Sequence, residues 1–212
     1  MNRTEALRQA KPILFNTEMV RAILDGRKTR TSRIVKKPYY IDNPDICRVS
    51  GFAMHSGINA TNGMPDPDRP YRPGDILYVR ETWAINNITP NDPKWLYKAD
   101  HDCSIRPYSK WKWCPSIHMP KEAARIFLRV TDVRVERLQD ITPAEARQEG
   151  VKNAEYNPEC EDKPPWVLDE FELTQFSKLW NSTIPKKDLD RYGWNANPWV
   201  WVYEFERIEV TE

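Results

Sequence analysis

Two segments of the sequence alternate between apolar and polar side chains, and this alternation is the strongest constraint on the fold. The first covers residues 126–138, and the second covers residues 199–205, which read WVWVYEF. Successive side chains on a strand point to opposite faces, so both segments are predicted to be half-buried strands. The first is either one strand or two strands joined by a bend near Thr131 and Asp132. Such strands favour an α+β fold with a mostly antiparallel sheet.

Other elements follow from local signals. The sequence TPAE at residues 142–145 is a capping box with proline at the first helical position, and Gly150 is the predicted end of that helix. The remaining predictions are a strand at 12–15, a helix at 18–25 capped by Thr17 and stopped by Gly26, a turn at 71–75, a strand at 76–84 and an amphipathic helix at 169–180.

Two long stretches lack clear periodicity. Residues 38–70 and 86–120 are rich in Pro, Asn, Asp, Gly and Trp. Loops of this length inside a compact domain are unusual and commonly functional, so we interpret both stretches as insertions. A chain of 212 residues without repeats or a convincing linker is predicted to be a single domain, residues 1–212.

The charge balance excludes some classes of protein. The chain carries 32 Lys and Arg and 31 Asp and Glu, so it is neither a polycation nor an acidic tail protein. Its charges are nevertheless segregated, because residues 1–40 hold ten basic and three acidic residues whereas residues 140–172 hold three basic and ten acidic residues. This pattern indicates one cationic surface suited to phosphate-bearing ligands, although solvated surface is the commoner explanation of charge runs.

The N-terminus and the cysteines indicate a cellular compartment. The sequence MNRTEALRQAKPILF is charged where a signal peptide is apolar, and no apolar run approaches the roughly 20 residues of a membrane span. We therefore expect a cytoplasmic protein with no membrane partner. Its four widely spaced cysteines are predicted to be free thiols: Cys47, Cys103, Cys114 and Cys160.

The segment from Gly26 to Arg33, GRKTRTSR, is the most informative for chemistry. It lacks the spacing of a phosphate-binding P-loop but holds four cations and three hydroxyls in residues 27–33. Lys28 and Thr31 would point to opposite faces of a straight strand, so they meet only if the backbone bends after Gly26. A neutral Lys28 amine could then take the proton of the Thr31 hydroxyl, because neighbouring arginines and burial disfavour the charged ammonium.

Glu149 is the candidate third member of this group. It falls in the last turn of the predicted helix that ends at Gly150, where the helix dipole disfavours a carboxylate by roughly 0.3–1 kcal/mol. Its position therefore has no reason in helix stability. An ordinary surface glutamate is the alternative, and the physics alone favours it.

The motifs together resemble a known family. The strings PILF, GRKTRTSR, RPGDILYVRETWA, ITPAEARQEG and WVWVYEFERI, with PSIHMP from Pro115 to Pro120, are similar to the ASCH-domain family of PUA-like folds, and in particular to its long bacteriophage and prophage members. The resemblance covers about half of the chain. It implies a β-barrel of mostly antiparallel strands with flanking helices, here carrying two long insertions.

The resemblance also implies an activity. Family members bind RNA or modified nucleosides, and small bacterial members hydrolyse N4-acetylcytidine with a lysine, a threonine and a glutamate. These residues match Lys28, Thr31 and Glu149. The expected function is therefore a nucleoside- or RNA-directed amidohydrolase without cofactor or metal. Two alternatives remain open, namely a non-catalytic RNA- or DNA-binding module and a phage protein that binds a host or virion partner.

Further residues are candidates for substrate binding. The cations of the GRKTRTSR segment and the residues after the Gly74–Asp75 turn are candidates for lining the pocket, and tryptophans beside Lys110 and Lys112 are candidates for stacking on bases. The predicted set is Arg27, Arg30, Arg33, Arg80, Glu81, Trp111 and Trp113. A surface ion pair is an equally good explanation of Arg80 and Glu81. A zinc site is a weaker alternative for His101, Cys103, Cys114 and His118, whose spacing matches no standard motif.

Overall fold

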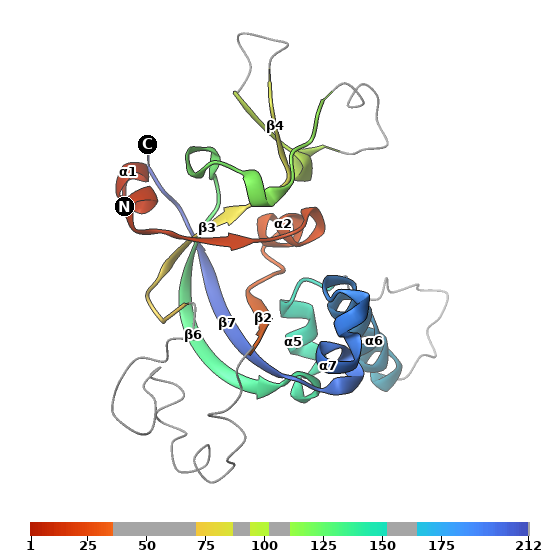
Figure 1. Ribbon diagram of the computed structural model, residues 1–212. Helices are drawn as coiled ribbons and strands as arrows, with labels where there is room; N and C mark the ends of the chain where they lie inside the picture. Colours follow the sequence, from red (N-terminus) through yellow and green to blue (C-terminus); the bar gives the residue numbers. More distant parts are fainter. Residues whose placement is uncertain (36–70, 87–93, 102–110, 152–164, 212) are drawn as a thin grey trace. The chain divides into compact units, whose positions relative to one another are not determined.

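The computed structural model describes residues 1–35, 71–86, 94–101, 111–151 and 165–211 (Figure 1). The chain divides into two compact units, each assembled from separate stretches of sequence. Unit 1 comprises Met1–Gly26, Gly74–Val130 and Glu206–Glu212, and unit 2 comprises Arg27–Pro73 and Thr131–Phe205.

The largest sheet has five strands in the order β1-β3-β6-β7-β2. The two alternating segments form its long strands, β6 (Phe127–Arg137) and β7 (Trp199–Ile208), as predicted. The first segment is one continuous strand rather than two. The pairs β3–β6 and β2–β7 are antiparallel, whereas β1–β3 is parallel, so the fold is α+β with a mixed, mostly antiparallel sheet. No closed barrel is formed by the strands that the structure describes.

Unit 1 contains short helices and strands. Its elements are α1 (Arg3–Gln9), β1 (Lys11–Leu14), α2 (Thr17–Leu24), β3 (Ile76–Arg80), β4 (Trp83–Ile85), β5 (Trp95–Tyr97) and the 3-10 turns η2 (Lys98–Asp100), η4 (Ser116–His118) and η5 (Lys121–Ala123). The strand predicted at 76–84 is wrong in one respect. It is divided between β3 of the large sheet and β4, which pairs with β5 in a separate sheet.

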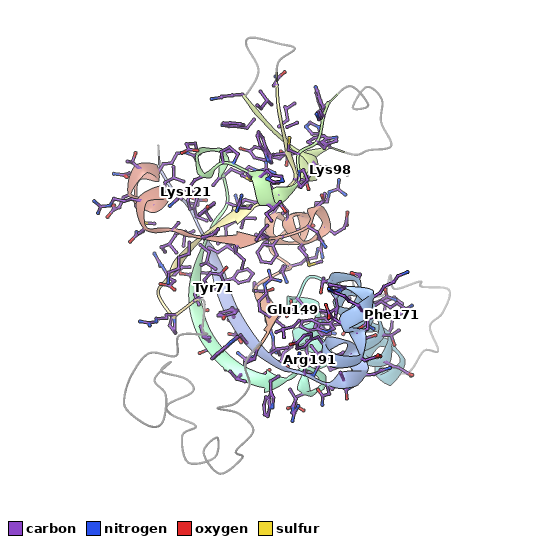
Figure 2. All side chains as sticks on the ribbon, in the orientation of Figure 1. Tyr71, Lys98, Lys121, Glu149, Phe171 and Arg191 are labelled. Atoms are coloured by element: carbon purple, nitrogen blue, oxygen red, sulfur yellow. The ribbon has the colours of Figure 1, made fainter. Side chains whose placement is uncertain are left out.

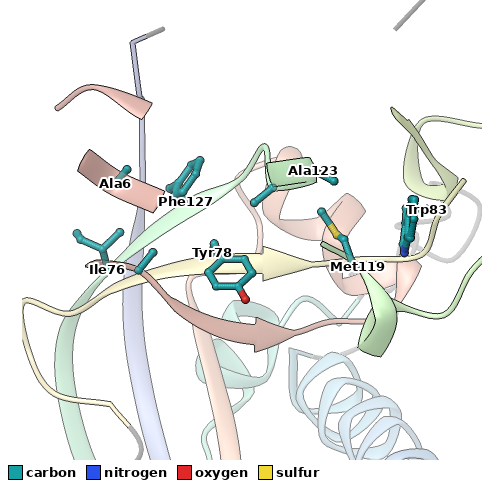
Figure 3. Packing of buried hydrophobic residues seen from close by; sticks show 9 residues of the cluster. Ala6, Ile76, Tyr78, Trp83, Met119, Ala123 and Phe127 are labelled. Carbon is teal, nitrogen blue, oxygen red and sulfur yellow. The ribbon is translucent and has the colours of Figure 1, made fainter. Parts of the chain in front are cut away.

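The core of unit 1 gathers on β3 and the segments that pack on it (Figure 3). Ala6 of α1 and Ala123 of η5 belong to this core with Tyr78 and Phe127, and Trp83 lies at the end of the cluster away from Ala6. Ala6, Ala123 and Phe127 are at most 1% exposed. Burial of the Phe127 side chain stabilises unit 1, because a fully buried large apolar side chain contributes roughly 1.5–3 kcal/mol to the free energy of unfolding.

Unit 2 holds the helices of the second half of the chain. Its elements are β2 (Arg30–Ile34), η6 (Leu138–Asp140), α5 (Pro143–Gln148), α6 (Pro165–Thr183), η8 (Lys186–Asp188), α7 (Leu189–Tyr192) and η9 (Trp194–Ala196). The predicted capping box is confirmed, since Thr142 accepts from Glu145 and the Glu145 carboxylate accepts from Thr142. Phe176 and Trp180 of α6 pack with Ala146 of α5 in the unit 2 core.

The two predicted insertions are only partly described. Residues 38–70 lie outside the described part of the chain, whereas residues 86–120 supply β5, η2 and η4. Of the helices that are described, none combines the length and apolarity needed to cross a membrane.

Candidate active site

Two glycines shape the backbone of a site in unit 2. Gly26 and Gly150 both have positive φ, which ends α2 and α5 with a sharp change of direction. The chain after Gly26 then runs against the end of α5, where the Thr29 amide donates to the Gln148 carbonyl at 3.0 Å. Figure 2 labels Glu149, the C-cap of α5, where this helix meets β2.

Lys28 and Glu149 form a buried ion pair at this point. Their Nζ and Oε2 atoms are 2.9 Å apart, although the residues are 121 positions apart in the chain. Nζ also donates to the backbone carbonyls of Arg30 and Glu149, each at 2.7 Å. An ammonium has three N–H groups for these three acceptors, whereas a neutral amine has only two. The three contacts therefore match the three N–H groups of a Lys28 ammonium.

Ser32 completes the coordination of the carboxylate. Its Oγ donates to Oε1 of Glu149 at 2.6 Å, while Oε2 accepts from Lys28. Lys28, Ser32 and Glu149 are 3%, 7% and 5% exposed, respectively. A charge pair at this depth is tolerated only where hydrogen bonds replace the lost water. We call these three residues the Lys28–Ser32–Glu149 cluster.

Burial and neighbouring charges act on the amine in opposite directions. Burial lowers the pKa of Lys28, and the charge and hydrogen bond of Glu149 oppose this effect. The positive charges of Arg33 and Arg30 lower the pKa of Lys28 further. Lys28 therefore releases its proton more readily than an exposed lysine does, as a catalytic base requires.

Thr31, the predicted nucleophile, lies beside this cluster on β2. Thr31 is 2% exposed and lies opposite Tyr203 of β7 in the antiparallel pairing of β2 with β7. Because side chains alternate along a strand, Thr31 lies on the face opposite to Arg30 and Ser32. The carboxylate of Glu149 contacts the hydroxyl of Ser32. Within the described residues, no hydrogen bond joins it to the hydroxyl of Thr31.

Arg30 occupies the same face of β2 as Ser32 and is bound internally. It is 1% exposed, and its guanidinium pairs with Glu136 at 2.8 Å and with Glu145 of α5. Lys28–Glu149 and Arg30–Glu145 thus join the basic N-terminal stretch to the acidic stretch at 140–172. These charges neutralise each other inside unit 2. They do not contribute to the cationic surface that the charge pattern indicated.

The other two arginines of the segment also make contacts in unit 2. Arg27 donates to the Gly150 carbonyl at 3.3 Å. Arg33 is half-buried, and burial lowers the pKa of its guanidinium against the opposing attraction of Glu149 and of Tyr71 and Tyr203. Arg33 is therefore near enough to the Glu149 carboxylate to interact with its charge.

The predicted residues Arg80 and Glu81 belong to unit 1. The Arg80 guanidinium donates to the Ile117 carbonyl. Glu81, which is 1% exposed, pairs with both arms of Arg125 at 2.9 and 3.0 Å. Glu81 thus forms an ion pair with a residue of another segment, but its carboxylate is buried rather than on the surface as the alternative explanation expected. Glu81 fixes Arg125, which also binds Asp100 and stacks on a tyrosine ring.

Trp111 and Trp113 also belong to unit 1. Their rings meet edge to face with centroids 5.9 Å apart, and His101 packs on both. Both tryptophans are half-exposed, and Lys112 between them is exposed. No group of three His, Cys, Asp or Glu side chains able to hold a metal occurs in the described ranges. Cys114 is a free thiol, whereas Cys47, Cys103 and Cys160 fall outside those ranges.

Sequence reasoning did not place Ser32, Glu136 or Glu145 in the site. For Ser32 a signal existed, since it follows Arg30 by two residues on a strand and so shares its face. The partners of Arg30 are more than 100 residues away, and no local pattern identifies them. Comparison of the chain with protein-family models, curated proteins and solved structures found no match.

Proposed function

We propose that this protein is a nucleoside- or RNA-directed amidohydrolase that removes the acetyl group of N4-acetylcytidine. Lys28, Thr31 and Glu149 are its catalytic residues in this proposal. One observation carries it: a lysine and a glutamate from distant segments form a buried pair at 2.9 Å, and Thr31 is the neighbour on β2 of Ser32, whose hydroxyl donates to the same carboxylate. The resemblance of the GRKTRTSR and ITPAEARQEG motifs to the ASCH-domain family supplies the substrate class.

The proposed reaction proceeds in two halves. Lys28 first passes one proton to Glu149, and Oγ1 of Thr31 then forms a bond to the acetyl carbonyl carbon while the neutral Lys28 amine takes the Thr31 proton. The C–N bond then breaks, and the leaving N4 amine takes the proton back from Lys28, which leaves cytidine and acetyl-Thr31. Water adds to this ester, the bond to Oγ1 breaks, and acetate and the Thr31 hydroxyl are released. Glu149 holds Lys28 in place and relays protons.

The finer fold assignment forms part of the same proposal. We interpret the five-stranded sheet with its flanking helices as the frame of a PUA-like barrel, with modified nucleosides or RNA as partners. The reducing cytoplasm is the proposed location, which is the bacterial host cytoplasm for a phage-encoded protein.

A nucleic-acid clamp built on the cationic segment has less support. Lys28 and Arg30 are at most 3% exposed and are paired with carboxylates, so they offer no free charge to a phosphate chain. A phosphate clamp needs accessible cations whose counterions are released on binding.

The direct test is turnover of N4-acetylcytidine by the purified chain, followed by chromatography of cytidine. Wild-type protein is expected to release cytidine, and Lys28→Met, Thr31→Val and Glu149→Gln are each expected to reduce kcat by on the order of 100-fold or more. Thr31→Val keeps the shape of the side chain and removes only the hydroxyl.

Matched controls are available on α6. Lys178 and Glu170 are exposed, so Lys178→Met and Glu170→Gln repeat the chemical changes away from the site and are expected to keep wild-type turnover. Absence of cytidine release by folded wild-type protein would refute the proposal. Equal rates for wild type and Thr31→Val would remove Thr31 as the nucleophile.

A further inference from the structure

Ser32 has a contact that a merely structural strand residue does not need. Its Oγ lies 2.6 Å from Oε1 of Glu149, the shorter of the two side-chain hydrogen bonds to this carboxylate. On β2 it faces α5 with Arg30 and pairs in register with Val202 of β7. The pairing of β2 with β7 therefore fixes the position of the Ser32 hydroxyl relative to the end of α5.

The geometry gives each carboxylate oxygen its own donor. Lys28 binds Oε2, and Ser32 binds Oε1. A glutamate side chain held by one donor can rotate about its terminal bond, whereas two donors on different elements fix the carboxylate plane. Ser32 therefore fixes the orientation of the Glu149 carboxylate relative to the Lys28 ammonium.

We propose that Ser32 is a positioning residue that holds the Glu149 carboxylate against Lys28 during amide hydrolysis. This inference rests on the proposed function. The role belongs to the hydroxyl rather than to the volume of the side chain. Threonine retains a hydroxyl that can reach Glu149, whereas valine has the same shape as threonine without a donor.

The test compares Ser32→Ala, Ser32→Thr and Ser32→Val by kcat for N4-acetylcytidine and by Kd for the product cytidine. Ser32→Ala and Ser32→Val are expected to lower kcat by on the order of 10- to 100-fold, because a misplaced catalytic group costs rate rather than affinity. Ser32→Thr is expected to stay within about threefold of wild type. Cytidine affinity is expected to be the same in all four proteins.

Thermal unfolding supplies a readout that does not depend on turnover. If Ser32 holds Glu149, then Ser32→Val lowers Tm more in the wild-type background than in a Glu149→Leu background, because the leucine has no carboxylate to hold. Ser177→Ala is the control, since the Ser177 hydroxyl bonds only its own helix at the Thr174 carbonyl among the described residues.

The outcomes separate the two claims. Wild-type kcat in Ser32→Val overturns the role of Ser32 and leaves the proposed function standing. Loss of kcat in both Ser32→Val and Ser32→Thr also overturns it, because side-chain volume is then what matters. If wild-type protein releases no cytidine, the proposed function fails. The Tm comparison then decides whether Ser32 holds the Glu149 carboxylate. Non-additive shifts support the hold of Ser32 on Glu149, and additive shifts refute it.

Discussion

Replacing Lys28 by methionine tests the energetic weight of the buried pair. Methionine nearly preserves the shape of the side chain but removes the ammonium, so Nζ no longer serves Oε2 of Glu149 or the carbonyls of Arg30 and Glu149. The Glu149 side chain is 6% exposed and would be left as a buried carboxylate with Ser32 as its remaining described donor. Breaking a buried pair in this way costs about 3–5 kcal/mol of unfolding free energy.

Removing both charges is expected to cost less than removing one. In Lys28→Met with Glu149→Leu neither member of the pair keeps a charge, and the groups that lose a partner are the neutral Ser32 hydroxyl and the carbonyls of Arg30 and Glu149. Leaving one such neutral group unsatisfied costs about 1–3 kcal/mol. Urea unfolding at pH 7 measures both losses, with Lys178→Met as the exposed control, expected within about 0.5 kcal/mol of wild type. A loss below about 1 kcal/mol for Lys28→Met, or a double variant as destabilised as the sum of its singles, would refute the buried ion pair.

Three further predictions concern other parts of the chain. Arg125→Met leaves Glu81 buried at 1% exposure without its bidentate partner, so urea unfolding is expected to show a loss of about 3 kcal/mol, and a loss under about 1 kcal/mol would contradict the pairing. Thr142→Ala removes the N-cap acceptor of α5, and we expect about 1 kcal/mol lower stability by the same assay, with an unchanged value arguing against the capping box. Burial raises the pKa of Tyr97 to about 12, partly opposed by the charge of Arg125. In the folded state the Tyr97 phenol therefore stays protonated up to a higher pH than it does in the unfolded chain. Its contribution to stability is therefore complete below about pH 10 and is lost as the pH rises toward about 12. In Tyr97→Phe the free energy of unfolding is expected to fall less between about pH 10 and pH 12 than in wild type. The same pH dependence in both proteins would contradict the burial of the phenol.

The elements that sequence predicted best are those whose signals are local. The capping box of Thr142 and Glu145 with Gly150 beyond the helix end defines α5 within ten residues of sequence, and the structure confirms it. The long alternating segments define β6 and β7 for the same reason. The predicted N-cap of α2 is wrong by one residue. Asn16, not Thr17, accepts from the Met19 amide, since both residue types are good caps.

The division of residues 76–84 into two strands coincides with a tertiary contact that no local pattern shows. Glu81 follows β3 directly and forms a buried pair with Arg125, which lies 44 residues further along the chain. β-propensity alone continues through this point. Helix α1 was also missed, although Asn2 caps it by accepting from the Glu5 amide.

The candidate site also depends on tertiary contacts that local sequence patterns do not show. Lys28 was singled out by the cationic segment and Glu149 by its unfavourable place at a helix end, and the ion pair accounts for that place, since Lys28 offsets the dipole cost. The roles of Ser32 and Arg30 depend on which face of β2 packs on α5. That face is set by strand register with β7 and not by any motif.

Trapping of the acyl intermediate tests the central claim most directly. Protein mixed with N4-acetylcytidine, quenched in acid during turnover and digested, is expected to carry one acetyl group in the peptide that contains Thr31, and fragmentation places it on Oγ1. The adduct is expected to be absent in Lys28→Met and present in Lys178→Met. Turnover without any acetylated peptide, or an acetyl group on any residue other than Thr31, including Ser32 and Lys28, would contradict the account.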